Sequence, residues 1–458
     1  MRLNLSSLIY ALPEDIDRAK KSGNFDELEA KLTERIMNPK TTPMLRDRLI
    51  AEKELMGRWI RRYPYNREQA LVAIQKRVSG FTAEELDYYE QQGSVDLIWW
   101  KGEKRYLSSF AGSLIKMNPE VKAREIDPDT EDDGCDLNLF MKELKENKEQ
   151  AWRFTVKSSL KMDDAFFVPG KTYLMHMPVP AASAQQSAKE IVIKTDADAV
   201  IAPENSFQRA VSVRRTLSEN KPLNTEYSFV ARLKYVDPVS DKPFIAYPDA
   251  LPPCEDDLSE QYPHIAFTPY LKALAKYIAG DETDKVKLAK KVYDYITLNV
   301  RYSYMRSYIL IDNHAEYAAL NLKGDCGIQA ILFITLCRIL GIPARWQSGH
   351  TVDKFSTGDH DWAQFWTEEF GWLFADPSYG GGAHRVGNEE RRNFYFGNLD
   401  PFRMVANRRY QTDFDVPKKF ERFDPYDSQD GEVETEEEGF DCNAYDTTDT
   451  TVEFVKLG

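Results

Sequence analysis

The sequence predicts a multidomain α+β protein built from four consecutive parts. Residues 1–125 repeat apolar side chains at helical spacing, whereas residues 126–245 open with an acidic linker and then alternate apolar and polar side chains. Helical spacing returns from about residue 265, within a third part that spans residues 246–405 and also contains strand-like runs. An acidic extension, residues 406–458, completes the chain of 458 residues.

The first part is predicted to be mostly helical. Apolar residues recur at helical spacing from Phe25 to Ile36 and again from Leu45 to Trp59. Thr82-Ala83-Glu84-Glu85 has the spacing of a capping box, which marks the start of a third helix. Residues 95–100 and 104–107 flank a Lys-Gly-Glu turn and predict a hairpin. No motif for catalysis occurs here, so we interpret these elements as packing units.

The second part is predicted to form a β-sandwich-like module. Trp152, Phe154 and Val156 alternate with polar residues, and the same period-two pattern recurs in residues 227–235. A short apolar strand is expected at residues 190–194. The acidic linker that precedes the module, residues 126–136, suggests a calcium loop, but Phe140 occupies the position where an EF-hand needs its closing Glu. We therefore expect a solvated linker there.

Charge and cysteine content limit the possible function classes. The formal charge is −14, and residues 424–458 hold twelve acidic side chains against one Lys, so the rest of the chain is nearly neutral. We expect this tail to be solvated and residues 430–439 to be mobile, although residues 451–457 could pair as an edge strand. No basic cluster predicts a nucleic-acid partner, and no apolar run is long enough to span a membrane.

The same features suggest a reducing location and no bound metal. The chain has five widely spaced cysteines and no recognisable signal peptide, so the expected location is the cytoplasm, without a disulfide framework. Neither a C-x-x-C pair nor an H-E-x-x-H motif is present, and no cofactor is predicted. The sequence does not indicate an oligomeric state.

Cys326 is the first candidate catalytic residue. It follows Gly324-Asp325 and precedes residues 328–340, which are apolar on nearly all sides and therefore predict a buried helix. A cysteine in the first turn of such a helix lies at the positive end of the helix dipole, which favours the thiolate. We therefore expect the pKa of Cys326 to be lowered, and Cys337 to be an inert thiol in the core.

His360 and Asp376 complete a constellation suited to nucleophilic catalysis. His360 lies in a predicted strand, residues 359–366, and Asp376 ends the next strand, residues 371–375. The histidine could accept the thiol proton, and the aspartate could hold the other ring nitrogen in the correct tautomer. His350 is interpreted as structural, and the glycines at 380–382 as a turn. Tyr302, Tyr304 and Asn313 stay open as donors to an oxyanion.

Together these motifs resemble the core of the transglutaminase-like superfamily, in the form of a bacterial-type multidomain member. The matching motifs are Gly324-Asp325-Cys326, Gly341-Ile342-Pro343-Ala344-Arg345, His360-Asp361-Trp362 and Asp376-Pro377-Ser378. The stretch that bears them, about residues 285–380, makes up roughly a fifth of the chain. The resemblance implies a papain-like catalytic domain in which Cys326 is the nucleophile, His360 the base and Asp376 the residue that orients the histidine.

The resemblance implies thiol-dependent acyl transfer or hydrolysis at a carboxamide or peptide bond, through a thioester on Cys326. The expected partner is therefore a protein or peptide substrate. Two alternatives stay open at this stage. One is a cysteine peptidase or amidase that uses water as its sole acceptor, and the other is a catalytically silent binding module.

Overall fold

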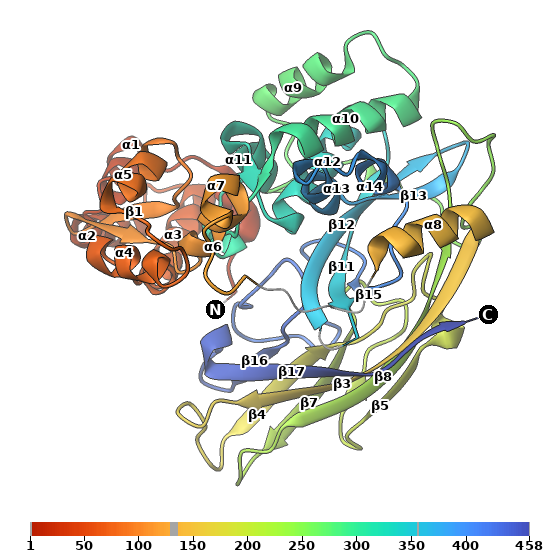
Figure 1. The fold of residues 1–458 in the computed structure, drawn as a ribbon. Helices are drawn as coiled ribbons and strands as arrows, with labels where there is room; N and C mark the ends of the chain where they lie inside the picture. Colours follow the sequence, from red (N-terminus) through yellow and green to blue (C-terminus); the bar gives the residue numbers. More distant parts are fainter. Residues whose placement is uncertain (1, 129–135, 355–356, 458) are drawn as a thin grey trace.

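The computed structural model describes residues 2–128, 136–354 and 357–457. Figure 1 shows a helical N-terminal part beside a mixed part with a central sheet, and two further sheets beneath them. The α+β class predicted from the sequence is confirmed. Within the described ranges, no helix is both long and apolar enough to cross a membrane.

The N-terminal part contains the predicted helices and hairpin. Thr82 caps its helix with the predicted capping box, since its side chain accepts from the Glu85 N–H while Glu85 accepts from the Thr82 N–H. The elements are α1 (Glu14–Lys21), α2 (Phe25–Met37), α3 (Pro43–Arg62), α4 (Arg67–Gln75), α5 (Ala83–Gln91), β1 (Leu97–Trp100), β2 (Glu103–Tyr106), α6 (Phe110–Met117) and α7 (Pro119–Lys122). Buried apolar residues from α3 to α6 belong to the same continuous core as the central part of the chain.

The sandwich consists of two four-stranded sheets with their own apolar core. One sheet has the order β16-β4-β7-β6 and the other β17-β3-β8-β5. The predicted strands around residues 152–156, 190–194 and 227–235 correspond to β3, β5 and β8. The elements are α8 (Leu137–Asn147), β3 (Glu149–Met162), β4 (Thr172–Pro178), β5 (Val192–Thr195), β6 (Val200–Ile201), β7 (Ala210–Thr216), β8 (Leu223–Lys234), β16 (Glu432–Thr435) and β17 (Tyr445–Leu457).

The acidic C-terminal residues contribute strands to this sandwich, so the prediction that residues 430–439 are mobile and solvated is wrong for residues 431–435, which are buried, whereas residues 436–439 are exposed. All four residues of β16 are buried and pair with β4, while β17 pairs with β3 along its whole length, as the edge-strand alternative allowed. The buried Glu432 carboxylate pairs with Lys418 at 2.6 Å and with Arg422 at 2.8 Å. Glu434 accepts backbone N–H groups from residues 419 and 420. These partners compensate the charges of Glu432 and Glu434, so the repulsion on which the prediction rested does not prevent the strand from packing.

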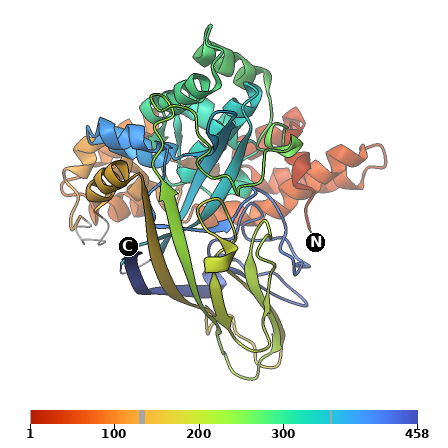
Figure 2. The same ribbon diagram turned by 90° about the vertical axis from the view of Figure 1, so that its right-hand side faces the viewer.

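The central part places a five-stranded sheet against a buried helix. The central sheet has the order β14-β13-β12-β11-β15, and Phe333 of α12 packs edge-on against Phe365 of β12. The helices are α9 (Pro269–Ala279), α10 (Lys285–Asn299), α11 (His314–Asn321), α12 (Cys326–Ile339), α13 (Pro377–Arg385) and α14 (Glu389–Phe394). The strands are β9 (Arg301–Tyr302), β10 (Lys323–Gly324), β11 (Ala344–Val352), β12 (Thr357–Thr367), β13 (Gly371–Ala375), β14 (Phe396–Gly397) and β15 (Arg403–Asn407). Figure 2 shows this sheet above the sandwich.

Two local expectations meet different outcomes. The glycines at 380–382 lie inside α13 rather than in a turn, so that prediction is wrong. Gly380 is needed there because a side chain would overlap Tyr293 of the neighbouring α10. The acidic linker is described only in part, and its residues 129–135 lie outside the described ranges.

Candidate active site

Cys326 is the first residue of α12, as the sequence predicts. Asp325 caps the helix, since its Oδ1 accepts from the Ile328 N–H at 3.2 Å and from the Tyr308 hydroxyl at 2.6 Å. Gly327 follows because any Cβ there would overlap the Tyr308 hydroxyl and the Asp361 carboxylate. The close packing of these groups leaves Cys326 only 9% exposed.

His360 and Asp376 meet as the sequence predicts. β12 and β13 are antiparallel neighbours, and the His360 Nε2 lies 2.8 Å from the Asp376 Oδ2. Asp376 is completely buried and also caps α13 by accepting from the Tyr379 N–H. Since Nε2 faces the carboxylate, Nδ1 is the ring nitrogen left for exchange of a proton with substrate or thiol.

Arg403 is a third member of this group that sequence reasoning missed. Its Nη1 donates to the Asp376 Oδ2 at 2.7 Å, while the rest of its guanidinium contacts Asp400. All three side chains are buried. No local sequence motif identifies Arg403. It lies on β15, an edge strand that β12 and β11 separate from β13, and it reaches Asp376 only in the folded chain.

Asp361 is the residue that contacts the Cys326 thiol. The Cys326 Sγ donates to the Asp361 Oδ2 at 3.3 Å, so in this structure the thiol bonds to Asp361 and not to His360. Alternation along β12 explains the contact, since Asp361 shares a face with Phe365, which packs on α12. That alternation is the sequence signal that could have identified Asp361.

The C-terminal segment, residues 422–432, supports Asp361 from the other side. The Gln429 side-chain amide donates to the Asp361 Oδ1 at 3.1 Å and to the His360 carbonyl at 3.2 Å. The Asp427 carboxyl accepts from Ser348 at 2.5 Å, and its charge raises the pKa of Asp361. A part of the chain expected to be solvated therefore packs against the candidate active site.

The electrostatics correct the expectation of a lowered thiol pKa. Burial raises the pKa of Cys326 well above its usual value, and the neighbouring carboxyl groups of Asp361 and Asp325 raise it further. Burial also lowers the pKa of His360, although Asp376 opposes the shift. The helix dipole is therefore outweighed, and the resting site holds a neutral thiol and a neutral imidazole.

The carboxyl groups near the thiol differ in charge state. Burial raises the pKa of Asp376, but His360 and Arg403 overcome this effect and hold that pKa far below its usual range. Asp361 shows the opposite shift, because burial and then Asp427 raise its pKa well above that of an ordinary aspartate. The pKa of Asp427 is raised to about 6, chiefly by burial. Asp376 is thus a fixed anion, whereas Asp361 and Asp427 retain a proton more readily.

The structure also places the three possible oxyanion donors and His350. Asn313 caps α11 through its side-chain oxygen, and Tyr304 packs against Gly112. Burial and then the charge of Cys326 raise the pKa of Tyr302 well above its usual value, which indicates that the Tyr302 hydroxyl lies near the thiol. His350 is buried and bonds the Gln429 carbonyl at 2.9 Å, in agreement with a structural role.

The other cysteines and possible metal ligands add no second centre. Cys337 is fully buried in α12 as predicted, Cys254 is exposed, and Cys442 is half-buried with a pKa raised to about 11 by burial. Cys135 lies outside the described residues. Among the residues that the structure places, no group of three or more His, Cys, Asp or Glu side chains could hold a metal ion.

A cysteine at the start of a buried helix that packs on an antiparallel sheet defines the papain-like class of fold. Residues 272–377 match the transglutaminase-like superfamily, and Cys326, His360 and Asp376 all lie within this range. The chain therefore contains a transglutaminase-like domain, and the resemblance found in the sequence is confirmed.

Similar solved structures come from bacteria. A candidate cysteine protease from Cytophaga hutchinsonii is 16% identical, with a TM-score of 0.41 over 66% of this chain and 98% of that protein. The periplasmic domain of TgpA from Pseudomonas aeruginosa is also 16% identical, with a TM-score of 0.28 over 56% of this chain and 96% of that domain. Among curated proteins, none matches this sequence significantly.

Proposed function

We propose that the protein is a transglutaminase-like cysteine acyltransferase or hydrolase. Cys326 attacks a carboxamide or peptide carbonyl and forms a thioester, and ammonia or an amine leaves. Water or a second amine then accepts the acyl group. The observation that supports this most strongly is the buried His360–Asp376 pair, held at 2.8 Å in the same domain as a cysteine at a helix N-terminus.

The electrostatics suggest how the proton moves. Thiol and imidazole both rest neutral, and the thiol bonds to Asp361, so the thiol first turns from Asp361 toward His360. Its proton then passes to His360 as the sulfur attacks the carbonyl. The ionised Asp376 then stabilises the imidazolium, and Arg403 keeps that carboxylate in place. His360 later returns the proton to the leaving amine. Backbone N–H groups at the start of α12 could stabilise the oxyanion.

Access to the thiol requires a local opening. Cys326 is 9% exposed and His360 5%, so a substrate reaches them only after neighbouring groups move. The C-terminal segment is one such neighbour, since Gln429 bonds both Asp361 and the His360 carbonyl. We expect turnover to depend on the mobility of this segment.

Product analysis tests the proposed function. The full-length protein is incubated with glutamine-containing peptides, with and without a primary amine, and mass spectrometry follows deamidation, amine incorporation and peptide cleavage. Incorporation of the amine supports acyl transfer, and cleavage or deamidation alone supports the alternative of water as sole acceptor. Cys326→Ala should abolish every product, whereas Cys254→Ala, at an exposed cysteine, should keep full activity. Equal product formation by Cys326→Ala would contradict the proposal.

We also propose the cytoplasm as the location and a protein or peptide as the substrate. The four cysteines that the structure describes all carry free thiols, which suits a reducing compartment. A peptide is the natural bearer of the carboxamide or amide carbonyl on which such a thiol acts.

A further inference from the structure

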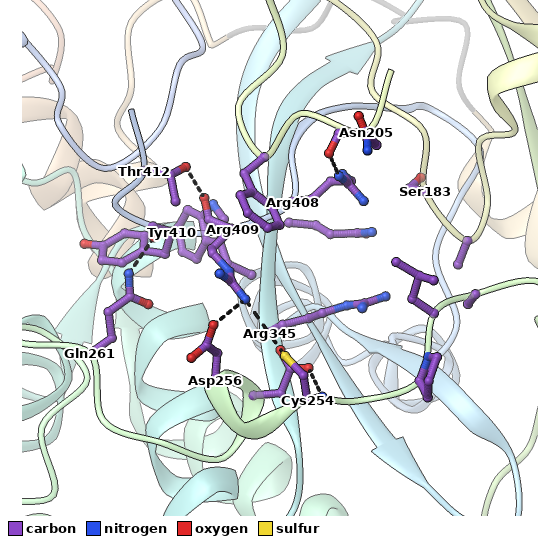
Figure 3. A pocket seen from close by; sticks show the side chains of 18 of the residues that line it. Ser183, Asn205, Cys254, Asp256, Gln261, Arg345, Arg408, Arg409, Tyr410 and Thr412 are labelled. Atoms are coloured by element: carbon purple, nitrogen blue, oxygen red, sulfur yellow. Dashed lines mark hydrogen bonds and ion pairs between the residues drawn. The ribbon is translucent and has the colours of Figure 1, made fainter. Parts of the chain in front are cut away.

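A pocket of about 630 Å³ lies apart from the three candidate catalytic residues. Its walls come from the loop before β7, from residues 249–261, from the start of β11 and from residues 408–412. Four arginines line it: Arg338, Arg345, Arg408 and Arg409. Figure 3 shows three of them, Arg345, Arg408 and Arg409, close together between Asn205 and Cys254.

Among the residues that the structure describes, three of these guanidinium groups have only neutral hydrogen-bond acceptors. Arg338 donates to the carbonyls of residues 344 and 259, at 2.9 and 2.8 Å. Arg345 donates to the Gln364 side-chain oxygen at 2.8 Å, and Arg408 to the carbonyls of residues 206 and 205. Within the described ranges no carboxylate lies within 4.0 Å of any of the three, whereas Arg409 pairs with Asp256 at 2.8 Å.

Such an arrangement favours a bound anion. A partly buried guanidinium without a carboxylate in direct contact loses part of its hydration, and an anion that binds to it restores that loss. Burial lowers the pKa of Arg338 and of Arg345 to about 10, although the charge of Asp257 opposes the shift at both, and Arg408 and Arg409 add repulsion to Arg345. The Arg345 guanidinium lies 3.8 Å from the Trp372 ring, which fixes its plane so that its remaining N–H groups are oriented in advance.

The other walls indicate the kind of anion. Four acidic residues line the same pocket, so the formal charge of the lining is balanced: Asp249, Asp256, Asp257 and Glu260. A polyanion such as a nucleotide would be repelled by these groups. Apolar side chains, including Phe207, Leu251 and Ile265, form the rest of the lining. A volume of this size suits a small molecule with one carboxylate, one cationic or polar group and an apolar body.

We propose that this pocket binds a short peptide through its terminal carboxylate, with Arg345 and Arg408 as the main contacts. A planar carboxylate can accept two N–H groups from one guanidinium, and the acidic rim can receive the peptide's ammonium group. Trp346 separates the pocket from the thiol, since it lines the pocket while its ring lies against Gly327. The proposal does not depend on the proposed function of Cys326.

Calorimetry on the full-length protein tests the proposal. The probes are the dipeptides Ala-Ala, Lys-Ala and Phe-Ala, each as the free acid and as the C-terminal amide, with inorganic phosphate as a separate anion. At least one free acid should bind with an affinity at least about tenfold higher than that of its amide, because the amide cannot form the charge-assisted hydrogen bonds. Arg345→Gln should weaken the binding of that free acid by about tenfold and leave the affinity for its amide unchanged.

Two further variants keep the test decisive. Arg153→Gln alters an exposed arginine of the sandwich that does not line the pocket, and it should bind like the wild type. If thermal unfolding shows that Arg345→Gln is not folded, Arg408→Gln provides the same comparison. Equal binding of acid and amide, binding of phosphate alone, absence of binding by every acid, or affinity unaffected by either pocket variant would overturn the proposal.

Discussion

At the scale of single residues, Asp361 is the neighbouring charge that raises the pKa of the Cys326 thiol most, after the effect of burial. Asp361→Asn keeps the shape of the side chain but cannot become an anion beside the sulfur, whose bond to Asp361 is 3.3 Å long. We therefore expect the pKa of Cys326 to fall, and the pH of half-maximal alkylation by iodoacetamide to move down by about one unit. Peptide mapping after limited labelling across a pH series measures this shift.

A neighbouring carboxylate provides the control. Asp359 lies two residues earlier on β12 and faces His350, so Asp359→Asn should leave the labelling of Cys326 unchanged. In the wild-type protein, the exposed Cys254 should be labelled before Cys326 at neutral pH, because the thiol at α12 is buried and protonated. Labelling of Cys326 first would show that its pKa is lowered, as the sequence alone suggested.

Asp376 acts both on His360 and on the buried Arg403, so its replacement should affect two properties. Asp376→Asn should lower turnover by about 10⁴, the size of the effect in a well-studied serine triad. It also removes a charge partner of Arg403, which should cost about 3–5 kcal/mol of unfolding free energy. Steady-state kinetics and chemical denaturation measure the two effects separately.

Asp400 separates stability from catalysis in this group. It is buried and pairs with Arg403 at 2.7 Å without touching His360. Asp400→Asn should therefore lose stability comparably to Asp376→Asn but retain turnover within about tenfold at temperatures where it is folded. If both variants lost turnover equally, Asp376 would be a structural residue and not the group that orients His360.

At the scale of elements, the cap of α12 makes stability depend on pH. Burial raises the pKa of Asp325 to about 7, so the folded protein holds a proton that the unfolded chain releases above about pH 4. The stability from this group is complete at low pH and is lost as the pH rises toward 7. Asn is an equally good cap without a charge, so the melting temperature of Asp325→Asn relative to wild type should increase by a few degrees over this range.

A second aspartate cap isolates the effect of burial. Asp284 caps α10 through the same type of bond but is exposed to solvent. The difference in melting temperature between Asp284→Asn and wild type should stay nearly constant from pH 4.5 to 8. A constant difference for Asp325→Asn as well would show that Asp325 does not hold a proton in the folded state.

The strand β16 anchors the C-terminal segment through Glu432. Burial raises the pKa of Glu432, but Lys418 and Arg422 outweigh it and lower the pKa overall, so its contribution is present above the unfolded value and lost in acid. Glu432→Gln leaves two buried cations without their anion, which should cost about 3–5 kcal/mol. Hydrogen exchange should accelerate across residues 424–435, and Cys326 should be alkylated faster because the segment holding Asp361 loosens.

A matched glutamate in the same region tests this link. The side chain of Glu437 is 64% exposed and pairs with Lys171 at 3.4 Å, so Glu437→Gln should change stability by less than about 0.5 kcal/mol. The rate at which Cys326 is alkylated in Glu437→Gln should equal the rate in the wild type. If Glu432→Gln exchanges faster at residues 424–435 but Cys326 is alkylated at the wild-type rate, loosening of this segment does not open access to the thiol.

The elements that the sequence predicted are those with strong local patterns. The apolar run of α12 and the alternation in β12 and β13 were readable, and they placed Cys326, His360 and Asp376 correctly on their elements. The C-terminal expectation failed because charge was counted over residues 424–458, whereas the cations that neutralise Glu432 lie just upstream, at Lys418 and Arg422. Asp361, Arg403 and Gln429 could not be assigned, since their roles depend on packing between segments distant in sequence.

At the scale of the whole molecule, the candidate site depends on every part of the chain. One apolar core extends from Leu8 to Tyr426 and includes α3, α6, α10 and α12. Asp96 of the N-terminal part pairs with Arg306 at 2.7 Å, and the Lys323 ammonium donates to the Gly93 carbonyl just before the cysteine helix. Asp427 and Gln429 close the opposite side.

The segment 246–405 should therefore not fold when it is produced alone. Removal of the flanking parts exposes the shared apolar core. It also removes the ion pair of Arg306 with Asp96 and the hydrogen bond of Gln429 to Asp361. We expect no cooperative transition in calorimetry, and Cys326 and Cys337 should react equally fast with a thiol reagent. In the full chain Cys337 should stay protected, because it is completely buried. A sharp unfolding transition of the isolated segment, together with protection of Cys337, would show that the transglutaminase-like core is an independent folding unit.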